Sequence, residues 1–318
     1  MRPVLQKESR RSVKTAISPR LRGALCVIIA GCSWGFSGTC SQFFYANSDA
    51  PAIWLTCVRA LAGGILLTLA AMRKGSPDLK AIWREPGEAL YLVGYAIFGL
   101  MSSQFCYLSC ISYANAPTAT VLQTLATVLT MLISCLTARR LPKGNEALSL
   151  VLAVLGTTLL ATRGDFTKMQ FSSGVLFWGA AIAVAGTAYN LLPKRLLDRW
   201  DRDVVLSYGM LIGGTVLSLA SRLWAIEVHI APAGYLALAA IVLFGALIPF
   251  PLFFQGLVDI GPVRSAILMA AEPLMATLLS TVWLKTRFTP GEWVGIISIV
   301  AIIFLLANPN TDKKKDCP

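Results

Sequence analysis

The chain has 318 residues, of which 56% are hydrophobic and only 14% are charged. Soluble globular domains carry about 25% charged residues, so this composition excludes an ordinary soluble domain and predicts a protein embedded in the lipid bilayer. The net charge of +12 would by itself suit a nucleic-acid partner. The Lys and Arg residues, however, sit in short clusters between apolar runs, which is typical of membrane flanks, so no nucleic-acid partner is expected.

Ten apolar runs follow one another along the chain. Most are close to the 20 or so residues that a transmembrane helix needs, and all are longer than the ten-residue strands of membrane barrels. They cover residues 23–43, 52–72, 89–112, 117–138, 146–162, 173–192, 204–221, 234–257, 262–283 and 291–307. The sequence therefore predicts an all-α membrane protein with ten transmembrane helices in the inner or plasma membrane.

The distribution of positive charge predicts the orientation of these helices. If the N-terminus is cytoplasmic, the cytoplasmic segments hold 22 of the 28 Lys and Arg residues, and the opposite segments hold five. The remaining one, Arg59, lies inside an apolar run. Because positive residues gather on the cytoplasmic side of membranes, both the basic tail 1–22 and the tail 308–318 are predicted to be cytoplasmic.

The second half of the chain repeats features of the first half at a nearly constant spacing. Phe98-Gly99 recurs as Phe244-Gly245, and Glu146 recurs as Glu292, in each case 146 positions later. Each match alone is weak, because several of these residues are common in the chain. Several matches in the same order and at one spacing predict a duplicated unit.

The two predicted units cover residues 23–162 and 173–307, and each holds five helices. An odd number of helices places the second unit upside down relative to the first in the membrane, with a pseudo-two-fold axis in the bilayer plane. Inverted repeats of this kind are typical of carriers, which open one central site to either side. The fold alone does not establish such a function.

Two ionisable residues, Arg59 and Glu272, lie near the middle of apolar runs. Each costs about 2.5–3.5 kcal/mol at a helix centre, so such residues usually face a bundle interior or a water-filled cavity. The functional hypothesis makes Glu272 a site for a proton or a cation and Arg59 a site for an anion. The alternative is that both are structural residues, satisfied by neighbouring helices or by each other.

Polar and aromatic residues near mid-membrane are further candidates for lining a substrate cavity. Interhelical hydrogen bonding, interface anchoring and plain packing are the alternatives for each of them. Together with Arg59 and Glu272, the candidates are Trp34, Ser37, Gln104, Tyr107, Gln123, Thr127, Tyr189, Asn190, Phe250 and Gln255.

Prolines inside two of the runs predict irregular backbone. Pro249-Phe250-Pro251 and Glu272-Pro273 each remove backbone hydrogen bonds of a continuous helix. At mid-depth in a carrier such a break marks a binding site or a hinge, and a simple packing kink is the alternative.

The sequence contains no motif for a resident cofactor or metal. It lacks a phosphate-binding P-loop, and its one histidine, His229, falls in a predicted loop, so no multi-histidine metal site forms. Seven of the eight cysteines lie within or beside apolar runs, where cysteine acts as a small buried hydrophobe. No cofactor, no metal and no enzymatic activity are therefore expected.

Short motifs in this pattern resemble those of the drug/metabolite transporter superfamily, specifically its EamA-type ten-helix members. The residues that carry the resemblance are Trp34-Gly35, Arg59, Tyr113-Ala-Asn-Ala-Pro117, Gly256-Leu-Val-Asp-Ile-Gly261-Pro262 and Ala271-Glu272-Pro273. The chain departs from the family pattern where a Gly-Glu-Arg-like turn is usual, since it has Ala138-Arg139-Arg140-Leu141 and Leu284-Lys285-Thr286-Arg287-Phe288 there. It also has Ala126-Thr127 in place of a first Glu-Pro pair.

The resemblance implies a secondary transporter of small organic metabolites, such as amino acids or drugs, that works by alternating access and favours export. Its partners would be a small-molecule substrate, the lipid bilayer and protons acting through Glu272, and the oligomeric state is left open. A flippase for lipid-linked or sugar-linked substrates is the alternative within the same superfamily. An intramembrane enzyme and a membrane partner without transport activity are the alternatives from other classes.

Overall fold

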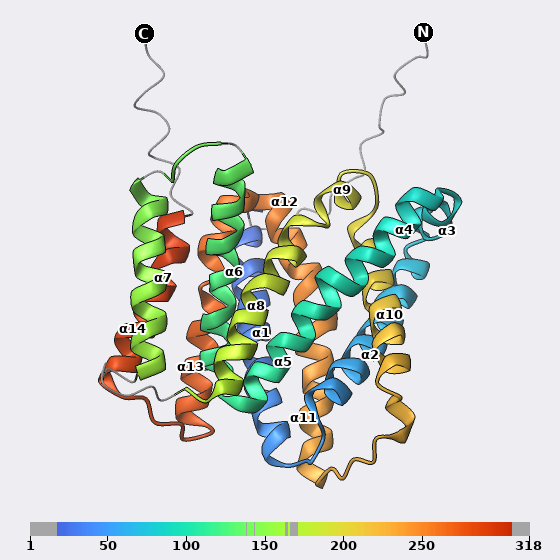
Figure 1. Ribbon diagram of the computed structural model, residues 1–318. Helices are drawn as coiled ribbons and strands as arrows, with labels where there is room; N and C mark the ends of the chain where they lie inside the picture. The colour runs from blue at the N-terminus through green and yellow to red at the C-terminus, as the bar shows by residue number, and fades with distance from the viewer. Residues whose placement is uncertain (1–17, 138, 143, 163–164, 166–170, 307–318) are drawn as a thin grey trace, which may run out of the picture.

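The computed structural model describes residues 18–137, 139–142, 144–162, 165 and 171–306. The described residues are nearly all helical and stand as a bundle of roughly parallel and antiparallel rods (Figure 1). Their only β contact is one antiparallel bridge between Ser48 and Ile230.

The helices of the first half run up and down the bundle in chain order. They are α1 (Pro19–Ala46), α2 (Ala52–Arg73), α3 (Asp78–Ala81), η1 (Ile82–Arg84), α4 (Pro86–Gly94), η2 (Tyr95–Met101), α5 (Ser102–Tyr113), α6 (Ala116–Thr137) and α7 (Gly144–Thr162). The helices of the second half follow the same pattern. They are α8 (Ser173–Leu191), α9 (Lys194–Leu197), α10 (Arg202–Ala220), η3 (Leu223–Ala225), α11 (Pro232–Val242), η4 (Leu243–Leu247), α12 (Pro249–Leu268), α13 (Ala271–Val282) and α14 (Pro290–Leu306).

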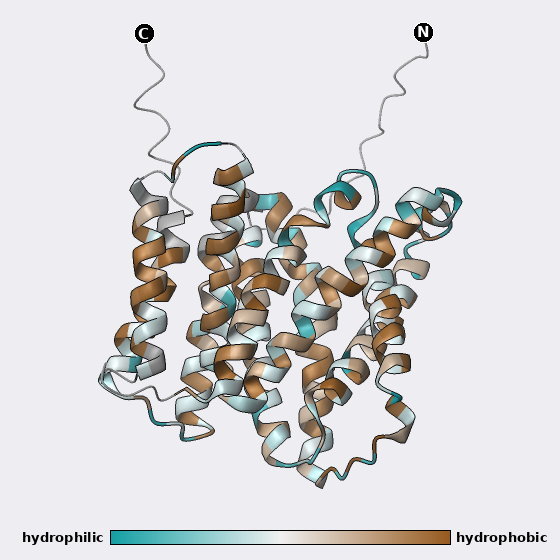
Figure 2. Ribbon diagram, viewed as in Figure 1, coloured by the Kyte–Doolittle hydropathy of each residue, from teal (hydrophilic) through white to brown (hydrophobic). Residues whose placement is uncertain are grey.

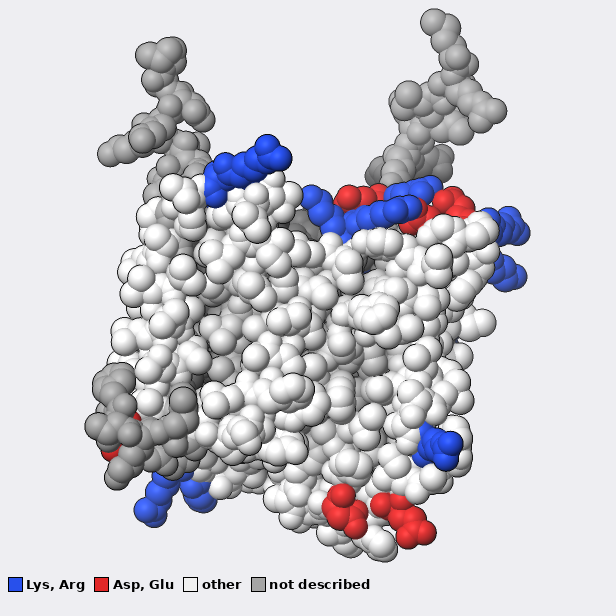
Figure 3. Space-filling view, viewed as in Figure 1, with Lys and Arg blue, Asp and Glu red and all other residues white. Residues whose placement is uncertain are grey.

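Seven helical segments within the described residues are long and apolar enough to cross a membrane, and two shorter apolar helices, Ala147–Leu159 and Pro290–Ile302, accompany them. Hydrophobic residues dominate the middle of the bundle, whereas hydrophilic ones gather in the loops at its two ends (Figure 2). On the face shown in Figure 3, Lys, Arg, Asp and Glu also lie at the two ends and leave a broad uncharged band between them. These features confirm a multi-pass membrane protein, because an uncharged, apolar band is what the hydrocarbon core requires.

One predicted helix boundary is wrong. The sequence pattern ended one helix at residue 257 and began the next at Pro262, but α12 continues through residues 258–262 to Leu268. The chain turns instead at Met269–Ala270, and α13 begins at Ala271. Pro273 explains this position, because its ring clashes with the carbonyl of the residue four positions earlier and that residue is Met269.

The helical ladder is locally widened at two places. Residues Tyr95–Met101 and Leu243–Leu247 form π-helical turns, η2 and η4, which join α4 to α5 and α11 to α12. At the end of η4, the Ile248 amide donates to the Leu243 carbonyl at 2.9 Å, a hydrogen bond across five residues. Such turns are uncommon and occur often at functional sites.

Small residues let the central helices approach closely. Helix α1 packs along α12 and α13, and α8 packs along α5 and α6, while α2 pairs with α10 and α7 pairs with α14 (Figure 1). At Gly35 on α1, a Cβ atom would lie 2.5 Å from the backbone oxygen of Glu272. The first turn of α13 is therefore held against the backbone of α1, as glycine allows in membrane helix packing.

Polar contacts join the two halves at both ends of the bundle. The segment after α1 meets the segment before α11 at the lower end in Figure 1. There the Ala231 amide donates to the Asn47 carbonyl at 3.0 Å, and the His229 amide donates to the Asp49 carboxylate at 2.7 Å. At the upper end, the buried Glu88 carboxylate accepts hydrogen bonds from Arg195 at 2.6 Å and Arg199 at 3.0 Å. The loops of one half are thus tied to those of the other.

The contact between α1 and α13 gives a first prediction. Gly35→Ala should cost about 1–3 kcal/mol of stability, because the new methyl group would collide with the Glu272 carbonyl. The measurement is the thermal midpoint of the purified protein in detergent. The control is Gly87→Ala, since a Cβ at Gly87 would meet no atom within 4 Å. Equal midpoints for the two variants would contradict the close approach.

The loop contact at Asp49 predicts a pH dependence. The His229 amide, and then the His229 ring, lower the pKa of Asp49 below its ordinary value of 3.8. A carboxylate whose pKa is lowered in the folded state contributes stability above its unfolded pKa, and that contribution is lost as the pH falls through the folded value. The thermal midpoint of the wild type should therefore exceed that of Asp49→Asn at pH 7, and the two should converge toward pH 3. A difference that stays constant over this range would contradict the assignment.

Candidate functional site

Helices from both halves of the chain surround one cavity of about 250 Å³ at mid-bundle. Its lining consists mostly of polar and aromatic side chains. The lining residues are Trp34, Ser37, Arg59, Ser103, Gln104, Tyr107, Gln123, Ala126, Thr127, Gly186, Tyr189, Asn190, Phe250, Phe253, Met269 and Glu272. This set contains every candidate that the sequence predicted except Gln255, which is exposed and donates a hydrogen bond to Asp259 at 3.0 Å.

Arg59 is buried in the cavity wall, where its side chain is held by a backbone carbonyl. The side chain comes from α2, is only 6% exposed, and its Nη2 donates to the Gly245 carbonyl at 3.1 Å. The remaining N–H groups of the guanidinium make no hydrogen bond to the described part of the chain. An arginine in this state can still bind an anionic group with several donors.

Glu272 lies on the first turn of α13, on the lining of the same cavity. Among the described residues, no Lys or Arg nitrogen lies within 4.0 Å of its carboxylate, and Arg59 does not form an ion pair with it. Glu272 is half-buried, and water in the cavity, a proton or a bound cation can offset its desolvation. The cavity thus presents two opposite ionisable groups that do not neutralise each other directly.

Aromatic rings form one wall of the cavity. The Trp34 ring meets the Phe250 ring edge-on with centroids 5.0 Å apart, and the Phe253 ring lies 5.7 Å away. The Trp34 indole also donates to the Gly245 carbonyl at 3.1 Å. On another side, Tyr189 stacks on Tyr95 with centroids 6.4 Å apart. Such surfaces pack against the apolar part of a small organic molecule.

Some polar side chains of the cavity have hydrogen-bond partners in the described part of the chain, and others have none. Tyr107 shares a hydrogen bond with Thr120 at 3.0 Å, and Ser37 donates to the Ile241 carbonyl at 3.4 Å, so both have structural partners. Gln104 and Gln123 make no hydrogen bond with any residue that the structure describes. These two amides are therefore free to bind a ligand.

Some lining residues were not predicted from the sequence. Phe253 follows Phe250 by three positions and Met269 precedes Glu272 by three, so helical spacing from predicted residues could have indicated both. Ala126 and Gly186 carry no polar group and gave no signal. They meet where α6 crosses α8, since a Cβ at Gly186 would lie 2.7 Å from that of Ala126.

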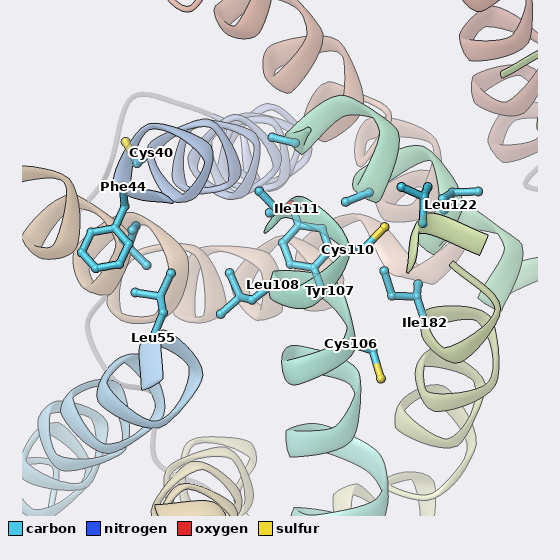
Figure 4. Packing of buried hydrophobic residues seen from close by; sticks show 14 of the residues in the cluster. Cys40, Phe44, Leu55, Cys106, Tyr107, Leu108, Cys110, Ile111, Leu122 and Ile182 are labelled. Carbon is cyan, nitrogen blue, oxygen red and sulfur yellow. The ribbon is translucent and has the colours of Figure 1, made fainter. Parts of the chain in front are cut away.

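The lower end of the bundle is packed with apolar side chains. A cluster of buried hydrophobic residues from α1, α2, α5, α6, α8 and α11 fills it, including Phe44, Leu55 and Ile111 (Figure 4). Gln42 links three segments there, because its Oε1 accepts from the Ala116 amide at 3.0 Å and from Ser280 Oγ at 3.3 Å, while its Nε2 donates to Thr286 at 3.4 Å.

Comparison with known proteins shows the family of this chain. The profile of the EamA-like transporter family matches residues 21–162 and 173–308. An uncharacterized inner membrane transporter of Salmonella typhimurium, YicL, is 34% identical over 90% of this chain and 95% of its own length. The uncharacterized transporter YwfM of Bacillus subtilis is 23% identical over 91% and 95%. One crystal structure shares the fold, with a TM-score of 0.61 and 20% identity over 91% of this chain and 96% of that one.

The family match and the names of these relatives indicate a membrane transporter rather than an enzyme. The chain belongs to the EamA-like transporter family. This confirms the resemblance that the short motifs indicated.

The hydrogen bonds of Gln42 give a prediction for stability. Gln42→Leu should lower the stability by about 1–3 kcal/mol, because it leaves the buried Ala116 amide without its acceptor. Thermal unfolding of the purified protein in detergent measures this effect. Gln255→Leu is the matched control, because Gln255 is exposed and bonds only to a side chain one turn away. If both variants unfolded at the wild-type temperature, the Gln42 hydrogen bonds would not contribute to stability.

Proposed function

We propose that this chain is a secondary active transporter that exports a small organic metabolite by alternating access. The substrate, an amino-acid-like, drug-like or other metabolite, would bind in the central cavity. Arg59 would bind its anionic group, and Glu272 would carry a proton or bind a cationic group. The polar and aromatic residues Trp34, Gln104, Gln123 and Tyr189 would complete the site, whereas Gln255 is not part of this proposed set.

The observation that carries the proposal is the pair of ionisable groups on one cavity. Arg59 and Glu272 both line it, yet no ion pair forms between them. Two structural residues that served only each other would be expected to bond directly, because an unpaired charge at this depth is costly. Two ionisable groups that do not bond to each other can reversibly bind a ligand or a proton.

The packing supports two inverted repeats of five transmembrane helices, residues 23–162 and 173–307, as the framework for this motion. The π-turns η2 and η4 contain Phe98-Gly99 and Phe244-Gly245, which lie 146 positions apart. The contacts of α1 with α12 and α13 correspond to those of α8 with α5 and α6. In this proposal, α13 forms part of the ninth of ten transmembrane helices, with both chain ends in the cytoplasm.

The cavity volume favours a small substrate over a lipid-linked one. Pockets for drug-sized ligands are typically 300–1,000 Å³, and this cavity is about 250 Å³. A lipid-linked sugar would need a larger site with an opening to the bilayer. Metabolites of modest size therefore fit the proposal better than the substrates of a flippase.

Neutralising Glu272 tests the proposal. A growth screen for metabolite resistance in cells that overproduce the protein supplies candidate substrates, and each is then measured in proteoliposomes with an imposed proton gradient. Glu272→Gln should reduce gradient-driven flux by about tenfold or more, because it removes the group that exchanges the proton or holds the substrate cation. The matched control is Glu227→Gln, since Glu227 is exposed in a loop.

Normal gradient-driven flux in Glu272→Gln, at wild-type expression, would contradict proton coupling through this residue. Absence of flux for every substrate from the screen in the wild type would contradict transport of small metabolites altogether. Fusions that report the side of each chain end test the cytoplasmic placement of the termini separately.

A further inference from the structure

We propose that Gly245 and Pro249 are positioning residues, which hold Arg59 and Trp34 in their binding orientations through one backbone carbonyl. This inference rests on the proposed function, because it explains how the anion-binding residue of the cavity is aimed. The carbonyl of Gly245 is the shared acceptor. It accepts from Arg59 Nη2 and from Trp34 Nε1, each at 3.1 Å.

Pro249 releases this carbonyl from the hydrogen bonding of the helix. In an α-helix, the carbonyl of residue 245 accepts from the amide of residue 249. Residue 249 is proline, which has no N–H, and it is the first residue of α12. The preceding turn, η4, is already widened to a π-helical turn. The Gly245 carbonyl can therefore turn toward side chains from other helices.

Gly245 leaves space beside its own carbonyl for the Arg59 side chain. A Cβ atom at Gly245 would lie 3.2 Å from Arg59 Nε and 3.3 Å from Arg59 Cζ, and it would also collide with the Ser37 hydroxyl. Only glycine leaves room for both the Arg59 guanidinium and the Ser37 hydroxyl beside this turn. Glycine is thus needed here for the close approach of a side chain to the backbone.

The Gly245 carbonyl orients two side chains of the cavity, Arg59 and Trp34. One N–H of Arg59 is fixed by the carbonyl, and its other donors have no partner in the described part of the chain. The same oxygen fixes the Trp34 ring, which then packs edge-on against Phe250. A single acceptor from the second half of the chain thus orients a cation of α2 and an aromatic ring of α1. Arg59 and Trp34 then form a binding surface for a ligand that has an anionic group next to an apolar part.

The test measures the reactivity of Arg59 and does not depend on a known substrate. Phenylglyoxal, which reacts with arginine, is applied to the purified full-length protein in detergent. Mass spectrometry of the digested protein gives the modification rate of Arg59 relative to that of Arg287, which is exposed in a loop. Pro249→Ala restores an amide that competes for the Gly245 carbonyl, so the relative rate at Arg59 should rise about fivefold or more.

Pro251→Ala is the matched control, because the amide that it restores would bond to the Leu247 carbonyl and not to that of Gly245. Its relative rate should stay within about twofold of the wild type. Gly245→Ala keeps Pro249 but displaces the guanidinium, and it should also raise the rate. General unfolding would also raise the rate at Arg59, because Arg59 is buried and Arg287 is already exposed, so each variant is first shown to be folded by its thermal midpoint in detergent.

An unchanged Arg59 rate in Pro249→Ala and Gly245→Ala, or an equal rise in Pro251→Ala, would overturn the inference. Should Pro249→Ala fail to fold, Gly245→Ala compared with Pro251→Ala decides the question. Failure of the transport assay would leave this result standing, because the labelling reports the geometry of Arg59 and not flux.

Discussion

The bond from Arg59 to the Gly245 carbonyl is the contact on which the centre of this molecule depends. A guanidinium within the hydrocarbon band is stable only if the protein supplies its partners. Here the partner is a main-chain oxygen that a proline has left without its usual donor. The same oxygen accepts a hydrogen bond from the Trp34 indole, so α1, α2 and the α11–α12 segment meet at one atom. The polar cavity opens beside this junction.

The cavity stays polar because its two ionisable groups are not neutralised by an ion pair. Arg59 and Glu272 approach it from different helices, and neither satisfies the other by a direct ion pair. Buried charges that pair fully give little freedom for exchange, whereas groups held apart can bind and release a proton or a ligand. Toward the lower end, the apolar cluster around Phe44 and Ile111 and the hydrogen bonds of Gln42 pack the helices together. The loop contacts and ion pairs at the two ends tie the halves together around this centre.

Much of this arrangement could be predicted from the sequence because a bilayer imposes strong rules. Apolar run length predicted the helices, and the cost of mid-membrane charge directed attention to Arg59 and Glu272. The helix that ends at Leu268 was predicted to end at residue 257, before Gly261-Pro262, because proline alone does not say whether a helix ends or continues. Gln255 was predicted to line the cavity but lies outside it. On an α-helix, five residues from Phe250 is far from the same face, whereas Phe253, three residues away, does face the cavity. The widened turn at η4 could not be read from the prolines alone, because a proline removes a backbone donor without specifying how the preceding turn rearranges.

Access to the cavity from both sides of the membrane is the most direct test of the whole account. Gln104 lines the cavity and makes no hydrogen bond within the described residues, so a cysteine there, in a background without the eight native cysteines, reports the site itself. A small, membrane-impermeant methanethiosulfonate is applied to right-side-out and to inside-out vesicles, and the labelling of this cysteine is measured. Alternating access predicts labelling from both sides. Labelling from one side only, under every condition, would contradict it.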